Sequence, residues 1–229
     1  MNQGTVEKVI PVVFAVYSAA MLKVEIPTTP LPLPLWVFSV VLVVAWFLEG
    51  LKPDALQLKR ANICFSVSGA FIPLAIALYL GFQSTYVMPF MIGLLIMAGL
   101  MFKLSKPDFL KGSIRFKLGY ALAISYGTSA LAALLMYSGS SIDLNIRTLA
   151  PLAGAVGTTG ILIGNIATAL ELSSQKATPA TFKQKIVLGG NGVRDVLWAP
   201  LIVAVILFTI PAILTELNCI PPILQQFFS

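Results

Sequence analysis

Residues 149–172 read LAPLAGAVGTTGILIGNIATALEL, and this stretch decides the fold class of the chain. Its side chains are uncharged until Glu171, in the last turn. A helix rises about 1.5 Å per residue, so a helix of this length crosses a hydrocarbon core about 30 Å thick. We therefore expect a membrane-spanning α-helix here.

Small residues recur along this helix at steps of three and four, which places them on one face. Such a face lets helix backbones approach closely in lipid. Residues 118–137 carry a similar stripe. The connection between the two helices is short, so we expect them to pack as a tight hairpin. Glu171 ends the first face, which directs it toward protein, although its position near the inner boundary equally allows it to snorkel to water. The first face holds Ala153, Gly157, Gly160, Gly164 and Ala167, and the second holds Gly119, Ala123, Gly127 and Ala130.

Apolar segments on both sides of this stretch extend the pattern to the whole chain. Of its 229 residues, 58% are hydrophobic and 10% are charged, whereas soluble domains carry about 25% charged residues. We predict an all-α, polytopic helical bundle of about seven transmembrane helices, forming a single domain over residues 1–229. The predicted spans are Val9–Leu22, Leu31–Leu48, Ala61–Phe82, Tyr86–Phe102, Leu118–Tyr137, Leu149–Leu172 and Val196–Leu214.

The first span is short for a bilayer, so it is either a retained helix or a cleaved signal peptide. Glu7 and Pro11 are unusual in a signal peptide, and we favour the retained helix. The C-terminal Ile220–Phe228 is too short to span, and we expect it along the outer surface.

Basic residues orient the bundle, because short cytoplasmic loops are rich in lysine and arginine. With the N-terminus inside and the C-terminus outside, only Lys23 and Arg147 of the fifteen fall outside. We therefore expect a multi-pass protein of the inner (plasma) membrane, and the net charge of +6 reflects orientation and not nucleic-acid binding. Interfacial aromatic residues agree: Trp36, Tyr86 and Tyr137 fall at outer ends, and Trp46, Phe102 and Trp198 near inner ends. The inner basic residues are Lys8, Lys52, Lys59, Arg60, Lys103, Lys106, Lys111, Arg115, Lys117, Lys176, Lys183, Lys185 and Arg194.

Metal and cofactor chemistry is not indicated. The chain has no histidine, the commonest metal ligand, and only two cysteines. Cys64 and Cys219 fall near opposite membrane faces, too far apart for a disulfide. We predict two free thiols, no metal and no cofactor.

Polar residues from three predicted spans converge on the cytoplasmic half, and this cluster is the candidate site. Asn165 lies about two turns inside its span, where an amide marks an interhelical hydrogen bond or a site. The glycines of 189–192 either offer backbone N–H groups to an anion or simply begin a helix flexibly. Pro73 predicts a kink at mid-membrane, a device of transporters that is also common elsewhere. The cluster comprises Asn62, Asn165, Glu171, Gly189, Gly190, Gly192, Arg194 and Asp195.

Three stretches resemble an uncharacterised family of prokaryotic membrane proteins, a domain of unknown function. Asn62 with Ser-Gly-Ala-Phe-Ile-Pro73 is similar to its Asn–Gly-Gly-Ala-Leu-Ile-Pro run. Residues 150–165 resemble its Ala-Pro…Gly-Thr-Leu-Ile-Gly-Ala-Asp stretch, and residues 189–195 its Gly-Gly-Ala-Gly-Thr-Phe-Asp motif. The resemblance implies two aspartates on adjacent helices, as in intramembrane aspartyl proteases, whose two carboxylates share a proton. This chain has Asn165 near the first position, and an amide cannot act as a general base, so Glu171 would have to substitute from another face.

Three functions remain open, and the catalytic residues are unknown. The leading hypothesis is a small solute or ion carrier or channel, with Glu171 and Asp195 as ion- or proton-coupling groups and Arg194 as their counter-charge. The alternatives are an intramembrane aspartyl-protease-like protein, active or inactive, and a non-catalytic assembly or scaffold subunit. The expected partners are the lipid bilayer, a small solute or ion, and another copy or a partner membrane subunit.

Overall fold

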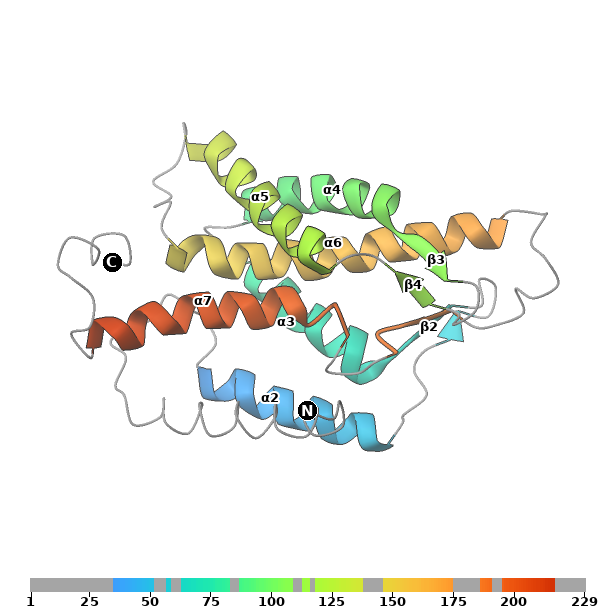
Figure 1. The fold of residues 1–229 in the computed structure, drawn as a ribbon, viewed down its shortest axis with the longest axis horizontal. Helices are drawn as coiled ribbons and strands as arrows, with labels where there is room; N and C mark the ends of the chain where they lie inside the picture. Colours follow the sequence, from blue (N-terminus) through green and yellow to red (C-terminus); the bar gives the residue numbers. More distant parts are fainter. Residues whose placement is uncertain are drawn as a thin grey trace.

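The chain folds as a bundle of helices with short strands at one end (Figure 1). The computed structural model describes residues 35–51, 57–58, 63–82, 87–108, 113–115, 118–137, 146–174, 186–190 and 195–216. The predicted span Val9–Leu22 and the segment Ile220–Phe228 lie outside them. The described helices are α2 (Leu35–Leu51), the π-helical turn η1 (Val67–Phe71), α3 (Ile72–Gly81), α4 (Val87–Leu104), α5 (Leu118–Tyr137), α6 (Ile146–Ser174) and α7 (Ala199–Glu216).

Two small sheets lie at the end of the bundle where α4 and α6 finish (Figure 1). The first has the order β1-β2-β5, with β1 and β2 antiparallel and β2 and β5 parallel. The second is an antiparallel pair of β3 and β4. The strands are β1 (Gln57–Leu58), β2 (Ile63–Phe65), β3 (Lys106–Asp108), β4 (Ser113–Arg115) and β5 (Ile186–Leu188).

Helix α6 is the centre of the molecule, and Figure 1 shows it crossing the middle of the bundle. It contacts α3, α4, α5 and α7, and every residue from Ala150 to Leu162 is buried. A helix that is apolar all round needs neighbours on every side. The stretch that decides the fold class is therefore the core helix.

The glycine face of α6 is filled by neighbouring helices, as the packing interpretation predicted. A Cβ on Gly157 would meet Ser125 and Pro200, and one on Gly160 would meet Met97. On Gly164 it would lie 2.7 Å from Cβ of Met101. These glycines set how closely α4, α5 and α7 approach α6.

Helices α5 and α6 pack against each other, as predicted, but the small-residue stripe of α5 faces the other way. A Cβ on Gly119 or Gly127 would meet nothing within 4 Å beyond its own helix turn, and Ala123 is exposed. Helix α5 contacts α6 through its hydroxyl-bearing face instead, where Ser125 donates a hydrogen bond of 2.6 Å to the Ala153 carbonyl. Buried hydroxyls need such partners, so the polar face turns inward and the small residues turn outward.

The predicted span Ala61–Phe82 is wrong at its start, because Ile63–Phe65 is extended and pairs with β5. Ser66 then begins the helix by accepting a hydrogen bond from the Gly69 N–H. Pro73 lies in the first turn of α3, and η1 directly precedes it in one continuous helical stretch. The π-helical turn interrupts the regular α-helix just before Pro73, at the place where the sequence predicted a kink. The predicted span from Val196 likewise begins at Ala199, after a turn.

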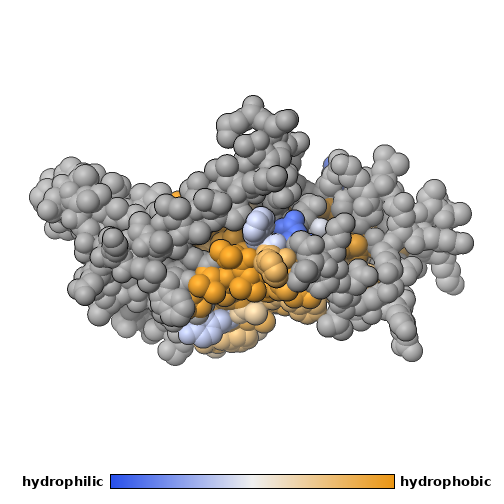
Figure 2. All heavy atoms as spheres, turned by 90° about the horizontal axis from the view of Figure 1, so that it is seen from below, coloured by the Kyte–Doolittle hydropathy of each residue, from blue (hydrophilic) through white to orange (hydrophobic). Residues whose placement is uncertain are grey.

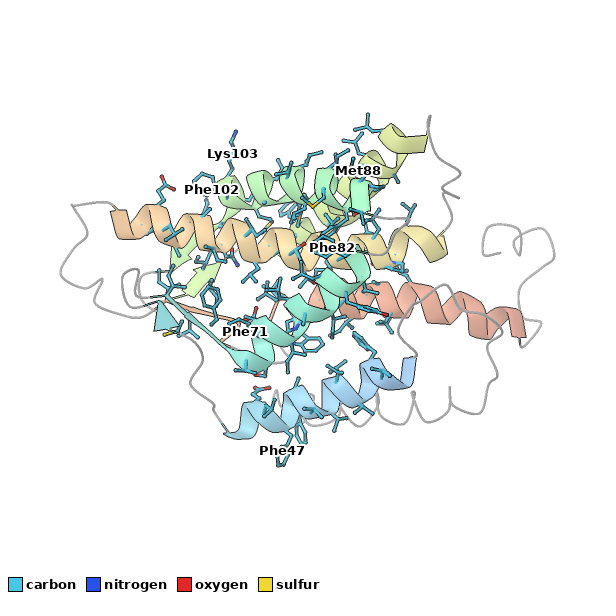
Figure 3. All side chains as sticks on the ribbon, turned by 180° about the vertical axis from the view of Figure 1, so that it is seen from behind. Phe47, Phe71, Phe82, Met88, Phe102 and Lys103 are labelled. Carbon is cyan, nitrogen blue, oxygen red and sulfur yellow. The ribbon has the colours of Figure 1, made fainter. Side chains whose placement is uncertain are left out.

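The outer helices expose large apolar side chains. Figure 2 shows a face whose described residues are mainly hydrophobic, and Phe47 of α2 points away from the bundle in Figure 3. Its side chain is 64% exposed, and that of Leu95 on α4 is 72% exposed. Two described helical stretches, Val87–Leu104 and Leu149–Leu172, are long and apolar enough to cross a membrane. Unlike α6, α4 is apolar while mostly uncovered, which is not expected of a helix that faces water.

Candidate functional site

Two strand-led segments lie side by side at the sheet end of the bundle, and they carry the candidate site. In the first, β2 leads through Ser66 into η1 and α3. In the second, β5 leads through Gly189 and Gly190 to Asp195 and then α7. The parallel pairing of β2 with β5 continues as a hydrogen bond of 2.9 Å from the Ser66 N–H to the Leu188 carbonyl. The starts of η1–α3 and α7 are thereby held close together, on the side of each helix that faces the strands (Figure 1).

The two segments touch through glycine backbones. A Cβ on Gly69 would collide with the Gly189 carbonyl, and one on Gly189 would lie 2.5 Å from the Gly69 carbonyl carbon. Gly189 also has φ +74°, a conformation that L-residues with a Cβ seldom adopt. Glycine is required at Gly69 and Gly189, so the first glycine of the Gly-Gly motif serves a close contact between two backbones.

Trp198 joins the same two segments from the interior. Its ring is completely buried, and its Nε1–H donates a hydrogen bond of 2.8 Å to the Ser68 carbonyl in η1. Phe38 of α2 meets the ring edge-on, with ring centroids 6.3 Å apart. The prediction that Trp198 belongs to an interfacial aromatic belt is wrong, because a hydrogen-bonded indole in the core satisfies its N–H within the protein.

Short polar side chains cap both segments. Asp195 Oδ1 accepts the Leu197 N–H at 3.2 Å, just as Ser66 Oγ accepts the Gly69 N–H at 3.3 Å. Ser66 Oγ and Ser68 Oγ are themselves 3.3 Å apart. A carboxylate at the start of α7 also interacts favourably with the helix dipole. The Asp195 carboxylate therefore stabilises the turn that leads into α7.

Asn165 is buried on α6, and its amide oxygen accepts a hydrogen bond of 3.0 Å from Ser105 Oγ at the end of α4. The predicted interhelical hydrogen bond is confirmed. Nearer the middle of the same helix, Thr158 Oγ1 donates to the Leu197 carbonyl at 2.9 Å. Asn165 lies two turns beyond Thr158 in the direction of the strands, and α7 runs antiparallel to α6 (Figure 1). Asn165 therefore lies toward the strand end of the bundle, as Asp195 does.

The predicted cluster is divided between two places. Gly189, exposed Gly190 and Asp195 belong to the second strand-led segment, whereas Asn165 is on α6 and contacts Ser105. Glu171 is exposed near the end of α6, so the prediction that it faces protein is wrong. Asn62, Gly192 and Arg194 lie outside the described residues. Over the described part of the chain, no group of three or more carboxylates and thiols is placed to hold a metal ion; Cys64 is a free thiol, and Cys219 lies outside that part.

Several residues of the site were missed from the sequence. Trp198 and Ser68 are 130 positions apart, and Ser105 and Asn165 are 60 apart, so no local pattern links them. The one available signal was the repeated order of strand, small polar cap and helix-starting proline, present at Ser66–Pro73 and again at Asp195–Pro200.

These features define a helical-bundle protein in which two of the described helices are long and apolar enough to cross a membrane, and in which two strand-led segments pair side by side. The chain belongs to the family described as "Protein of unknown function (DUF1614)", whose family model matches residues 49–207. That range includes both strand-led segments. No curated protein and no solved structure matches the chain. Membership of an uncharacterised family is confirmed.

Proposed function

We propose that this chain is a multi-pass inner-membrane protein with its N-terminus in the cytoplasm and its C-terminus outside. The uncovered apolar faces of α2 and α4 support this, because water would penalise them and lipid would not. The excess of basic residues in one set of loops supports the orientation.

Within that membrane, the proposed function is that of a carrier or channel for a small solute or ion. The observation that carries it is the pair of discontinuous segments, β2–η1–α3 and β5–α7, in contact with each other. Interrupted helices of this kind form the substrate sites of many secondary transporters. Asp195 is the candidate coupling group, Arg194 its counter-charge, and Glu171 a carboxylate at the water-facing mouth.

A transport path would have to open between the two segments. The glycine face of α6 is filled by α4, α5 and α7, so a path along that face is closed. The contact of Gly69 with Gly189 and the bond from Trp198 to Ser68 close the junction between the segments. Separating them would expose Ser66, Ser68 and Asp195 to a solute.

Flux into proteoliposomes tests the proposal. Purified full-length protein is reconstituted with a pH-sensitive or ion-sensitive dye inside, and gradients of H⁺, Na⁺, K⁺ and Cl⁻ are imposed in turn. We expect flux above that of empty liposomes for one ion, lost in Asp195→Asn and retained in the control Glu49→Gln on α2. The carrier proposal is abandoned if every gradient dissipates at the rate of empty liposomes.

A second candidate is a non-catalytic assembly subunit, favoured by the exposed stripe of Gly119, Ala123 and Gly127 on α5. Small residues on a lipid-facing helix promote association with another helix. Native mass spectrometry after extraction into a mild detergent would show a stoichiometric partner or a second copy. A clean monomer would remove this candidate.

A protease-like function is the remaining candidate, because Asp195 follows a Gly-rich turn that leads from a strand into a helix. It requires a second carboxylate, which Asn165 does not provide. In this case we propose that the chain is an inactive relative of intramembrane aspartyl proteases. We expect it not to cleave a transmembrane reporter peptide. Cleavage that disappears in Asp195→Ala would instead establish an enzyme.

A further inference from the structure

Basic residues cluster where α4 ends and the β3–β4 hairpin begins. Lys103 lies in the last turn of α4 and Lys106 begins β3, and both are exposed. The strand register pairs Lys106 with Arg115 of β4. Two cations are thus direct cross-strand neighbours, and a third lies less than one turn of chain before them.

This arrangement repels itself unless an anion lies nearby. Like charges paired across antiparallel strands are destabilising, and nothing in the described part of the chain forms an ion pair with Lys103 or Lys106. The one carboxylate of the hairpin strands, Asp108, is in register with Ser113 at the far end of the strand pair. A counter-ion from outside the chain would relieve the repulsion.

The surface beside these cations is strongly apolar. On α4, Leu95 is 72% exposed and Phe102 is 38% exposed, directly before Lys103. Figure 3 shows Phe102 and Lys103 at the same end of α4, with Lys103 extending away from the bundle. The change from apolar to cationic within one turn matches the boundary between acyl chains and phosphate headgroups.

We propose that Lys103 and Lys106 bind the phosphate of an anionic phospholipid whose acyl chains lie along the exposed face of α4. The inference rests on the membrane location in the proposed function and is independent of transport. An orientation signal needs positive charge only in the loop, whereas this site needs the charges at these two positions. It would tie the hairpin, and the neighbouring sheet, to the inner membrane surface.

Lipid titration of the purified full-length protein tests the site. Native mass spectrometry in neutral detergent gives the apparent Kd for phosphatidylglycerol and for phosphatidylcholine. Each cation near an anionic headgroup contributes about fivefold in affinity. We therefore expect Lys103→Gln/Lys106→Gln to bind phosphatidylglycerol roughly 25-fold more weakly, with phosphatidylcholine binding unchanged.

The control removes equal charge elsewhere, as Lys23→Gln/Arg147→Gln, and should bind phosphatidylglycerol like the wild type. Circular dichroism melting without added lipid confirms that both double variants are folded. Equally weakened phosphatidylglycerol binding in both variants would show that only net charge matters and would overturn the site. Displacement of bound phosphatidylglycerol by inorganic phosphate, at concentrations similar to those of the lipid, would overturn it as well. Alkaline extraction of native membranes tests the membrane location separately, and loss of the protein into the supernatant would refute that location. A failed flux assay would refute the carrier proposal and leave the lipid site unaffected.

Discussion

Trp198 shows how one side chain links segments that are distant in sequence. Its indole fills the core beside Phe38, and its single donor reaches the Ser68 carbonyl in η1. The π-helical turn and the start of α7 are therefore held together by a directional bond as well as by packing. A phenyl ring would keep the packing and lose the bond.

Trp198→Phe should lower the free energy of unfolding by about 1–3 kcal/mol, because it leaves a buried carbonyl without its donor. Denaturation in mixed detergent micelles measures this. Trp46→Phe is the matched control, since Trp46 is 41% exposed on α2, and it should change stability much less. Equal losses in the two variants would contradict the role of the bond.

Asn165 and Ser105 should be energetically coupled through their hydrogen bond. Interhelical hydrogen bonds between side chains in membrane proteins average about 0.6 kcal/mol and reach about 1.7 kcal/mol. A double-mutant cycle with Asn165→Ala and Ser105→Ala in the same micelles should give a coupling energy in that range. Strictly additive effects would show that the bond contributes nothing.

At this scale the sequence predicted the environment of Asn165 better than its partner. A lone amide inside an apolar helix has to find a hydrogen bond, whatever the fold, so burial with a partner was predictable. That the partner is Ser105 depends on the contact of α4 with α6. The prediction that Glu171 faces protein was wrong for a related reason. Helical spacing shows which face of a helix a residue lies on, but it does not show where the neighbouring helices end.

At the scale of elements, α5 and α6 carry similar small-residue stripes, but the stripe of α6 is buried and that of α5 is exposed. The glycines of α6 are covered by larger residues of α4, α5 and α7. Helix α5 has a competing face with Ser125 and Ser129, both completely buried. Satisfying those hydroxyls decides its rotation, so its glycines face outward.

Gly160→Ala and Gly127→Ala should therefore change stability in opposite directions. The added methyl at position 160 would meet Met97, with overpacking typically costing about 1–3 kcal/mol. At position 127 it meets nothing within 4 Å, and the gain in helix propensity is about 1 kcal/mol. Thermal unfolding of both variants in one detergent measures the difference, and a stabilising Gly160→Ala would refute the packing.

The helices themselves were largely predictable, because each needs an apolar segment of a certain length. The span Leu118–Tyr137 matches α5 at both ends, and Leu149–Leu172 lies wholly within α6. The strands were not predictable, since Ile63–Phe65 is as apolar as the helix that follows it. Only its pairing with Ile186–Leu188 distinguishes it.

At the scale of the whole molecule, large apolar side chains lie outside as well as inside. Phe47, Leu95 and Met88 are exposed, while the core also holds buried serine and threonine hydroxyls. This agrees with the proposed membrane location, in which the exterior meets lipid and close helix contacts replace hydrophobic collapse.

The two cysteines can test the proposed orientation. In intact cells a membrane-impermeant maleimide should label Cys219 in the Cys64→Ser variant, because Cys219 follows the last span outside. It should leave Cys64 unlabelled in the Cys219→Ser variant until the cells are opened. Labelling of Cys64 alone in intact cells would invert the topology.

The parallel pairing of β2 with β5 has a consequence for biosynthesis. Cys64 must find Val187, and the ribosome makes more than half of the chain between them. Until β5 emerges, the edge of β2 lacks its partner strand, and the close contact between Gly69 and Gly189 cannot form. The candidate site is thus among the last parts to assemble, and a nascent chain stalled before residue 186 would present an open strand edge to chaperones or quality-control proteases.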